Sequence, residues 1–265
     1  MKYIIKIVII FSLIITALTG CPEKSNNLTL KKGILLVGVN TNYQPINFIL
    51  DDVVNLAGFE ISLAKAIGEK LGLEVQFINA NEGIYIHLGK DRSDCVISSV
   101  TITEHHLKSF NFSIPYLQNT LVIVMLNDSQ HSVSSPGDLK GLRVAYQSET
   151  ISQNYIEQLG QEGILFTPFE YDSLMSCFND LHLGRIHAVM TDLITGIEYI
   201  SSDSLKIVWQ GEEEIFGICL KKGNDALTEV INKALYELFE DGTILRISKE
   251  FFKGRDLVSM LHIRQ

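Results

Sequence analysis

Polar residues that can bind a charged ligand stand directly after apolar runs of the sequence. Asp192 follows the apolar run at 188–190, while Ser99 and Thr101 follow a second such run. Thr150 precedes a stretch with helical spacing. A carboxylate in such a place can bind an ammonium group, and the unpaired backbone amides of a helix start can bind a carboxylate. Each of these side chains can also act as a helix N-cap, so spacing alone leaves both roles open.

A small zwitterion would match this set of groups. A zwitterion that leaves water needs an anion for its ammonium group, and a cation with backbone N–H groups for its carboxylate, because an unpaired buried charge is very costly. An aromatic face usually packs the rest of such a ligand. The sequence shows no motif for a nucleophile, a metal or a phosphate loop. The pattern therefore favours binding over catalysis.

Apolar runs of strand length alternate with stretches of helical spacing and must position these groups. The run 33–39 (GILLVGV) precedes a turn with Pro45 and an amphipathic pattern over 60–71. A second alternating series begins after the polar stretch 132–135 and ends in a long amphipathic helix. Alternation of this kind predicts α/β structure with parallel sheets covered on both faces.

The two series are of similar length, and no Gly/Ser-rich linker separates them. We predict separate strands near 110–112 and 121–126, and a further strand over 215–220. Two lobes joined by ordered strands would form a hinge over a cleft. Two domains also agree with the chain length of 265 residues.

Composition excludes some classes of protein. The chain carries 22 Lys and Arg against 31 Asp and Glu, a formal net charge of −9, and 46% of its residues are hydrophobic. Such a chain is neither disordered nor collagenous. Its acidic balance argues against nucleic-acid binding, which needs clustered Lys and Arg to neutralise phosphates.

The first twenty residues have the layout of a secretory signal peptide. Lys2 and Lys6 precede the apolar run 7–15, and the segment ends with LTGC at 18–21. A helix over the uncharged part would measure about 21 Å, short of the roughly 30 Å needed to span a bilayer. The LTGC sequence resembles a bacterial lipobox, in which the cysteine, here Cys21, is lipidated and becomes the new N-terminus. An ordinary signal peptide with an incidental cysteine is the alternative.

Residues 21–32 would form a tether, since 22–29 are polar and turn-rich. The remaining cysteines, Cys95, Cys177 and Cys219, lack metal-site spacing and lie in apolar contexts. We interpret them as buried apolar side chains, with one disulfide still open. No metal or cofactor is expected.

A series of short motifs spans nearly all of the chain after residue 32. They are 39–45 (VNTNYQP), 58–60 (GFE) ahead of 63–67 (LAKAI), Asp94 before 95–97, 101–103 (TIT), 112–116 (FSIPY), 138–141 (DLKG), 183–185 (LGR), 191–192 (TD) and 217–218 (GI) ahead of 221–223 (KKG). Their order and spacing resemble the extracytoplasmic solute-binding proteins of polar amino-acid ABC importers, a family that includes glutamine-, histidine- and arginine-binding proteins.

The resemblance implies a periplasmic-binding-protein fold with a ligand cleft between two α/β lobes. Lobe 1 would contain 33–121 plus 216–265, and lobe 2 would contain 122–215. The protein would then be a monomer, held by lipid at the periplasmic or extracytoplasmic membrane face. It would deliver an amino acid or related amine to an ABC permease in the inner membrane.

The resemblance also suggests ligand-binding residues. It gives Asp192 the role of the acid that binds the ammonium group, and Tyr43 the role of an aromatic wall. The full candidate set is Tyr43, Asn81, Ser99, Thr101, His106, Gln147, Thr150 and Asp192.

Departures from the family pattern bear on the ligand. His106 stands where the family has the arginine that clamps the ligand carboxylate, Glu149 stands where it has glycine, and Asn81 replaces an aromatic wall. Histidine titrates near neutrality and lacks the arginine fork. We therefore expect a basic amino acid, an amine or a derivative without a free carboxylate, unless another Lys or Arg compensates. Asp91 and His187 replace Gly and Asp of two Gly-x-x-Asp turns, and these two positions look structural.

Two other functions remain open at this point. The same fold also hosts dehydratases of cyclic aromatic precursors, which use a cleft carboxylate as general acid, and Glu149 or Glu82 could serve as that carboxylate. A ligand sensor that has lost the transport role is the other alternative.

Overall fold

The computed structural model describes residues 28–50, 55–80, 83–200 and 203–258. Cys21, the signal peptide, Asn81 and Glu82 lie outside the described residues. Within the described ranges, no helix is long and apolar enough to cross a membrane.

The chain alternates strands and helices in the order that the sequence predicts. The part up to the first crossing contains β1 (Ile34–Val39), β2 (Asn42–Tyr43), β3 (Asn47–Ile49), β4 (Leu56–Ala57), α1 (Phe59–Leu71), β5 (Glu74–Asn79), α2 (Ile84–Gly89), β6 (Cys95–Val96) and α3 (Glu104–Ser109). The remainder contains β7 (Phe110–Leu126), η1 (Pro136–Leu139), β8 (Arg143–Gln147), α4 (Ile151–Gln161), β9 (Thr167–Tyr171), α5 (Leu174–His182), β10 (Ala188–Asp192), α6 (Leu193–Ile200), β11 (Leu205–Lys221), α7 (Asp225–Glu240) and α8 (Thr243–Phe251).

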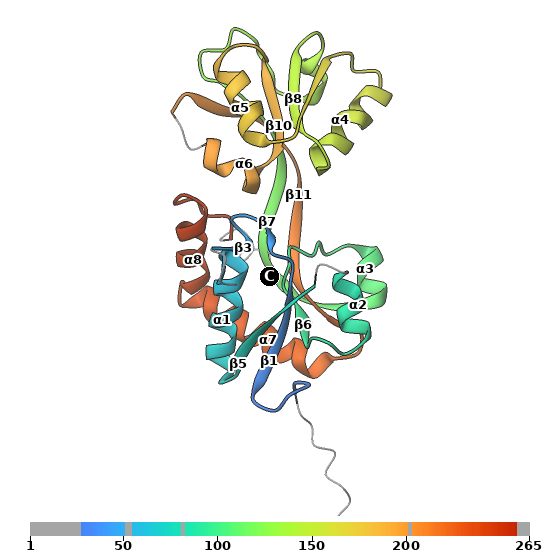
Figure 1. Ribbon diagram of the computed structural model, residues 1–265, viewed down its shortest axis with the longest axis vertical. Helices are drawn as coiled ribbons and strands as arrows, with labels where there is room; N and C mark the ends of the chain where they lie inside the picture. The colour runs from blue at the N-terminus through green and yellow to red at the C-terminus, as the bar shows by residue number, and fades with distance from the viewer. Residues whose placement is uncertain (1–27, 51–54, 81–82, 201–202, 259–265) are drawn as a thin grey trace, which may run out of the picture.

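One sheet runs through both lobes, in the order β5-β1-β6-β11-β7-β10-β8-β9. Strands β5, β1 and β6 are mutually parallel, and so are β9, β8 and β10. The long strands β7 and β11 run from one lobe to the other (Figure 1) and are antiparallel to each other and to their neighbours. The prediction of parallel sheets is therefore right within each lobe and wrong for the strands that cross between the lobes.

The crossing strands are longer than the sequence pattern predicts. The strands predicted near 110–112 and 121–126 are one 17-residue strand, β7. The run 215–220 is the end of β11, which is also 17 residues long. Pro115, which cannot donate a ladder hydrogen bond, interrupts the pattern, and it lies beside a register shift of the ladder. The proposed lobe boundaries fall inside β7 and β11, and that division stays a prediction.

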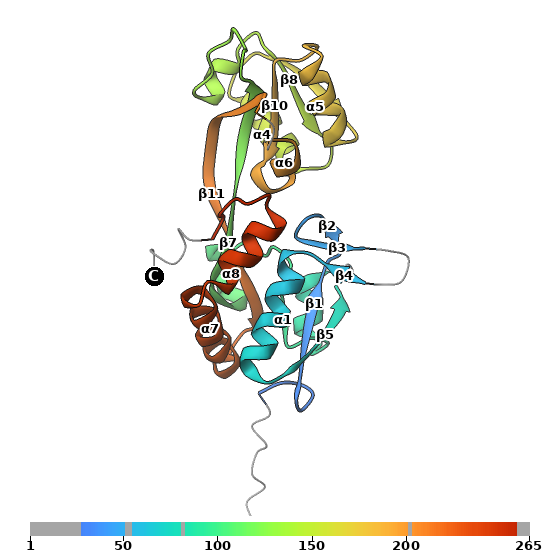
Figure 2. The same cartoon turned by 90° about the vertical axis from the view of Figure 1, so that its left-hand side faces the viewer.

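Helices cover both faces of the sheet. In lobe 1, α1, α7 and α8 pack together on one face (Figure 2), and α2 packs against β1, β6 and β11. Of the apolar positions that the helical spacing predicts for α1, Ile61, Ala64 and Ile67 are buried and Leu71 is partly buried, while Phe59 and Leu63 are buried as well. In lobe 2, α4 packs on β8 and β10, while α5 and α6 pack against each other.

The two lobes repeat one strand arrangement, with β1 and β8 at the centre of equivalent parallel triplets. Just before β6, the Asp94 carboxylate accepts the N–H of Leu36 on β1 at 2.8 Å. Just before β10, His187 Nδ1 accepts the N–H of Arg143 on β8 at 3.0 Å. Histidine thus takes over the acceptor role of the usual aspartate, and both turns are structural.

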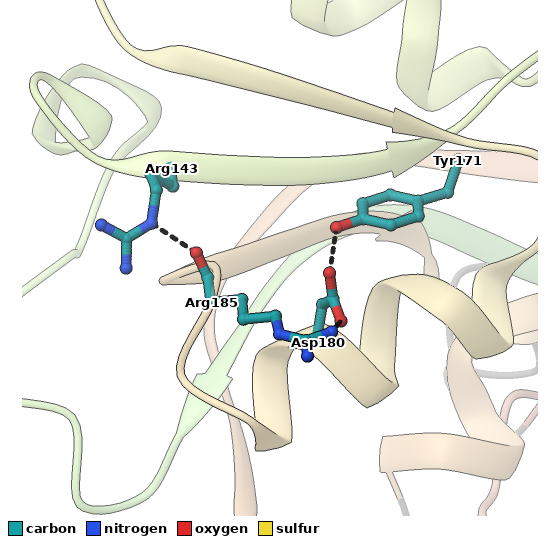
Figure 3. A network of polar contacts seen from close by, with 4 residues as sticks. All are labelled: Arg143, Tyr171, Asp180 and Arg185. Carbon is teal, nitrogen blue, oxygen red and sulfur yellow. Dashed lines mark hydrogen bonds and ion pairs between the residues drawn. The ribbon is translucent and has the colours of Figure 1, made fainter.

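The end of α5 is anchored by a polar network (Figure 3). Asp180 accepts a hydrogen bond from the Tyr171 hydroxyl at 2.6 Å and forms an ion pair with Arg185 at 2.9 Å. Arg143 donates to the carbonyl oxygens of Gly184 and Arg185. Burial, then the hydrogen bond to Asp180, raises the pKa of Tyr171 to about 12. The network fastens β8, β9 and the turn before β10.

The described cysteines are free thiols and are buried. Burial raises the pKa values of Cys177 and Cys219 to about 12 and also raises that of Cys95. Among the described residues no disulfide forms, and the three side chains act as small apolar groups.

A fully buried carboxyl group, that of Glu60 on α1, joins three segments of lobe 1. Its Oε1 accepts the N–H of Ser99 at 2.7 Å, the Ser99 hydroxyl at 3.1 Å and the hydroxyl of buried Tyr116. Its Oε2 accepts the side-chain amide of Asn47. Burial raises the pKa of Glu60, and these hydrogen bonds oppose that shift. Ser99 has a φ of 49°, so the bonds also hold a backbone conformation that is costly for a side chain with a Cβ.

Replacement of Glu60 by alanine should lower the free energy of unfolding by about 3 kcal/mol, because it opens a cavity and leaves the N–H of Ser99 and the hydroxyl of buried Tyr116 without their acceptor. Urea unfolding would measure this loss. Glu69→Ala, at an exposed position of the same helix, is the control and should change stability little. A similar, small effect in both variants would contradict the interpretation.

The hydrogen bond from Arg143 to His187 predicts a pH-dependent stability. Burial, together with the charges of Arg143 and His131, lowers the pKa of His187. Its stabilising contribution is therefore present above the unfolded pKa and is lost as the pH falls through the folded pKa. The variant His187→Asn keeps an acceptor that does not titrate, so stability should fall less between about pH 7.5 and about pH 5.5.

Urea unfolding at both pH values would test this expectation, with His182→Asn, an exposed histidine of α5, as control. An unchanged pH dependence in His187→Asn would show that other groups cause it.

Candidate ligand-binding site

Asp192 and Tyr43 meet where the two lobes join. Asp192 ends β10, and Tyr43 ends β2, just after β1. The Tyr43 hydroxyl donates to Asp192 Oδ1 at 3.2 Å. Asn119, buried on β7, donates to the same oxygen at 3.1 Å and lies 3.4 Å from the Tyr43 hydroxyl. Residues from both lobes and a crossing strand therefore share one hydrogen-bonded group.

The N-cap role of Asp192 is also present. Its Oδ1 accepts the N–H of Thr195 at 3.0 Å, and its Oδ2 accepts the Thr195 hydroxyl. Asn119 Oδ1 accepts the N–H of Ile194 at 3.2 Å. These bonds satisfy backbone amides in the first turn of α6, which otherwise lack partners. They also fix the Asp192 carboxylate beside Tyr43.

The Tyr43 hydroxyl lies in a negative electrostatic environment. Burial raises the pKa of Tyr43, followed by the charges of Asp192, Glu214 and Glu60 and the hydrogen bond to Asp192. Glu214 lies on β11, with Asn119 as its cross-strand partner. The electrostatic surroundings of Tyr43 are thus negative and suit a cation.

Thr101 lies on the lobe 1 side of this group. Its hydroxyl donates to Glu214 Oε1, and its backbone pairs with Phe216. The neighbouring Ile102 donates its N–H to Ile215 at 3.0 Å. Ser99, two residues earlier, directs both its N–H and its hydroxyl to Glu60. Among Ser99, Thr101 and Ile102, Thr101 is therefore the residue whose side chain hydrogen-bonds to the crossing strand.

His106, in the place of the family arginine, contacts the backbone of the same strip. Its Nδ1 lies 2.8 Å from the carbonyl oxygen of Thr101, and its ring stacks on Phe112 with 6.4 Å between ring centroids. The backbone N–H of His106 donates to the hydroxyl oxygen of the N-cap residue Thr103 at 3.1 Å, as predicted for a helix that begins after Thr103.

The lobe 2 candidates form a separate group. The hydroxyl of Thr150 donates to the Gln147 carbonyl at 2.7 Å, and Gln147 Nε2 donates to the Asp172 carbonyl at 3.1 Å. Glu149 is exposed, with a φ of 58°. That backbone conformation favours glycine, which explains the family residue at this position. Within the described structure, no hydrogen bond or ion pair joins this group to Tyr43 or Asp192.

Two members of the site, Asn119 and Glu214, were not predicted from the sequence. Asn119 is a polar residue within a mostly apolar strand, and Glu214 ends the run Glu212, Glu213, Glu214. Those features were visible, but the pairing of β7 with β11 that brings the two side chains to the site was not.

The described residues contain no group of three or more His, Cys, Asp and Glu side chains able to hold a metal ion.

A groove of about 520 Å³ borders the crossing strands on the lobe 2 side and is lined by Leu121, Tyr155, Gln158, Trp209, Gly211 and Glu212.

Comparisons with known proteins agree with this architecture. Residues 35–254 match the family described as bacterial extracellular solute-binding proteins, family 3. The L-cystine-binding protein TcyJ of Escherichia coli (strain K12) is 30% identical over 235 residues, covering 87% of this chain and 86% of TcyJ. The ABC transporter arginine-binding protein 1 of the same strain is 31% identical over 223 residues, covering 81% of this chain and 89% of that protein.

A solved structure, the L-cystine solute receptor of Neisseria gonorrhoeae in the unliganded open conformation, has a TM-score of 0.72 and 27% identity. The match covers 86% of this chain and 95% of the receptor. These relatives are named as amino-acid-binding proteins, and one of them is named as a component of an ABC transporter. Motifs, two-lobed fold and comparisons together show that the chain belongs to family 3 of the bacterial extracellular solute-binding proteins.

Proposed function

We propose that this protein captures a basic amino acid or a related amine outside the cytoplasm and delivers it to an ABC permease. The observation that carries the preference for a cation is the pair of carboxylates that converge on Asn119: Asp192 accepts hydrogen bonds from Asn119 and Tyr43, and Glu214 lies on the strand position directly opposite Asn119. Neither carboxylate has a Lys or Arg partner within the described part of the chain. An ammonium or guanidinium group would supply the missing positive charge.

Each residue has a distinct role in this proposal. Asp192, fixed by Asn119 and Thr195, binds the ammonium group. Tyr43 provides an aromatic surface whose hydroxyl is already bonded to Asp192. The ligand would replace the direct contact between Tyr43 and Asp192, which joins the two lobes, by contacts of its own with both lobes.

The site offers weak support for a ligand carboxylate. His106 uses Nδ1 on the Thr101 backbone, and the Thr101 hydroxyl is engaged by Glu214. The neighbouring carboxylate would also repel an anion. The relative that binds arginine is compatible with a cationic ligand.

Catalysis is not part of the proposal. Of the two candidates for a dehydratase acid, Glu149 lies within the described residues. Its side chain is exposed, and its backbone N–H donates to the side-chain oxygen of Gln153 at 2.8 Å. A dehydratase would need its acid next to the bound substrate, and among the described residues no hydrogen bond joins Glu149 to Tyr43 or Asp192. We expect no turnover of prephenate or arogenate.

A lipid anchor at Cys21 would keep the receptor near its permease. The proposal rests on the LTGC sequence and on the polar residues that follow it. One acyl chain binds a membrane only weakly, and stable anchoring generally needs two or more. The proposal therefore requires that Cys21 carry at least two acyl chains.

Thermal shift assays with the purified protein test the ligand class. Arginine, lysine, ornithine or an amine should raise the melting temperature, since a ligand at about 100 times its Kd adds about 2.7 kcal/mol of stability. Asp192→Asn should weaken binding by at least about tenfold, because a hydrogen bond to a charged group contributes about 1.5–3 kcal/mol.

Asp180→Asn, a carboxylate of lobe 2 with no contact to the site, is the matched control and should bind normally. Saturable binding of glutamate or aspartate in preference to these cations would refute the proposed ligand class.

Cell fractionation tests the anchor. The wild-type protein should sediment with membranes, and Cys21→Ser should move it to the soluble extracytoplasmic fraction because no acyl chain is attached. Cys177→Ser, at a buried thiol, should leave the protein with the membranes. Retention of the Cys21→Ser protein in the membrane fraction would contradict lipidation at that residue.

A further inference from the structure

Glu214 is a second carboxylate beside the hydrogen-bonded group of Tyr43, Asn119 and Asp192. It lies on crossing strand β11, directly opposite Asn119 on β7. Asn119 in turn binds Asp192, and Asp192 binds Tyr43. Glu214 therefore adjoins the candidate ligand-binding group from a crossing strand, independently of β10, which carries Asp192.

The two carboxylates of the site differ in how fully they are bonded. Asp192 Oδ1 accepts hydrogen bonds from Tyr43, Asn119 and Thr195. Within the described residues, Glu214 accepts only the hydroxyl of Thr101. A carboxylate has about four acceptor positions, so the half-buried Glu214 retains capacity for a charged donor.

The contact with Thr101 also affects a ligand carboxylate. A hydroxyl has a single proton to donate, and Thr101 donates it to Glu214. A ligand carboxylate placed against Thr101 would therefore lack this donor and would lie beside a second carboxylate. Like charges at such short range disfavour one another strongly in a partly buried site.

We propose that Glu214 determines specificity in this site by binding a second cationic group and excluding an α-carboxylate. The preferred ligand class is then an amine with two cationic groups and no carboxylate, rather than the parent basic amino acid. One cationic group would bind Asp192 and the other Glu214. This inference rests on the proposed function, since it assumes that the ligand binds between Tyr43 and Asp192.

The rejection of an α-carboxylate is a form of selection by repulsion. Discrimination between two ligands depends on the difference of their binding free energies, and an unfavourable contact with the competitor contributes as much as a favourable contact with the ligand. Agmatine and arginine differ by the carboxylate alone, as do cadaverine and lysine, and putrescine and ornithine. These pairs isolate the contribution of Glu214.

Isothermal titration calorimetry of the purified protein with these three pairs tests the inference. The wild type should bind the amine of each pair at least about tenfold more tightly than the amino acid. Glu214→Gln keeps the size of the side chain and removes its charge, so the preference should shrink by about tenfold or reverse. Glu213→Gln, at the adjacent exposed position, should leave the preference unchanged.

A second variant guards against a folding defect in Glu214→Gln. Thr101→Val removes the hydroxyl and leaves Glu214 charged, so the preference for the amine should persist. If Glu214→Gln does not fold, loss of the amine preference in Thr101→Val overturns the inference and its retention supports it.

The outcomes separate this inference from the proposed function. If the wild type binds arginine, lysine or ornithine at least as tightly as the matching amine, the inference is wrong while the cationic receptor stands. If Glu214→Gln folds and keeps the wild-type preference, another residue sets it and the inference is again wrong. If none of the six cations binds, both the inference and the proposed function fail.

Discussion

The antiparallel pairing of β7 with β11 is the constraint on which the rest of this structure depends. The ladder extends from Leu205 opposite Leu126 to Lys221 opposite Phe110. It joins two parallel triplets into one sheet and is continuous through both lobes. Because each crossing strand is bonded to the other along its length, the lobes are connected by ordered backbone rather than by flexible linkers. The register shifts within the ladder supply local bends without breaking that connection.

This pairing brings together the polar residues of the candidate ligand-binding site. Asn119 and Glu214 face each other across the ladder, and their neighbours on either side are Asp192 at the end of β10 and Thr101 after β6. The ends of parallel strands converge at the same edge of each triplet, where turns and helix starts leave polar groups exposed. The site is consequently built from strand ends of both lobes, with the hinge between them. Closure of the lobes and ligand recognition can then involve the same side chains.

The buried carboxyl group of Glu60 holds in place the segments that carry Tyr43 and Thr101. Glu60 binds the Ser99 backbone, Asn47 near the Tyr43 turn, and Tyr116 on β7, so one carboxyl group ties the strip around Thr101 to the crossing strand. On the other side of the site, Asp192 and Asn119 accept backbone N–H groups from the first turn of α6 and so fix that helix to the crossing strand β7. Such fully bonded polar groups hold side chains in place because an unsatisfied partner in the interior is costly. The Asp192 carboxylate is thus held by three donors, whereas Glu214 accepts one hydroxyl among the described residues.

Local sequence determined much of this protein. Periodicity predicted the alternating α/β elements and the stripe of α1, and the motifs identified the family and the positions of Tyr43, Thr101 and Asp192. These features depend on neighbours a few residues apart, which a single sequence displays. Tertiary structure alone decided that the strands near 110–112 and 121–126 are one, that Glu60 is buried and bonded to Ser99, and that Asn119 and Glu214 lie opposite each other beside Asp192. Those outcomes depend on pairing between residues far apart in the chain, such as Glu214 with Asn119, and register between distant strands is fixed only when the whole sheet packs.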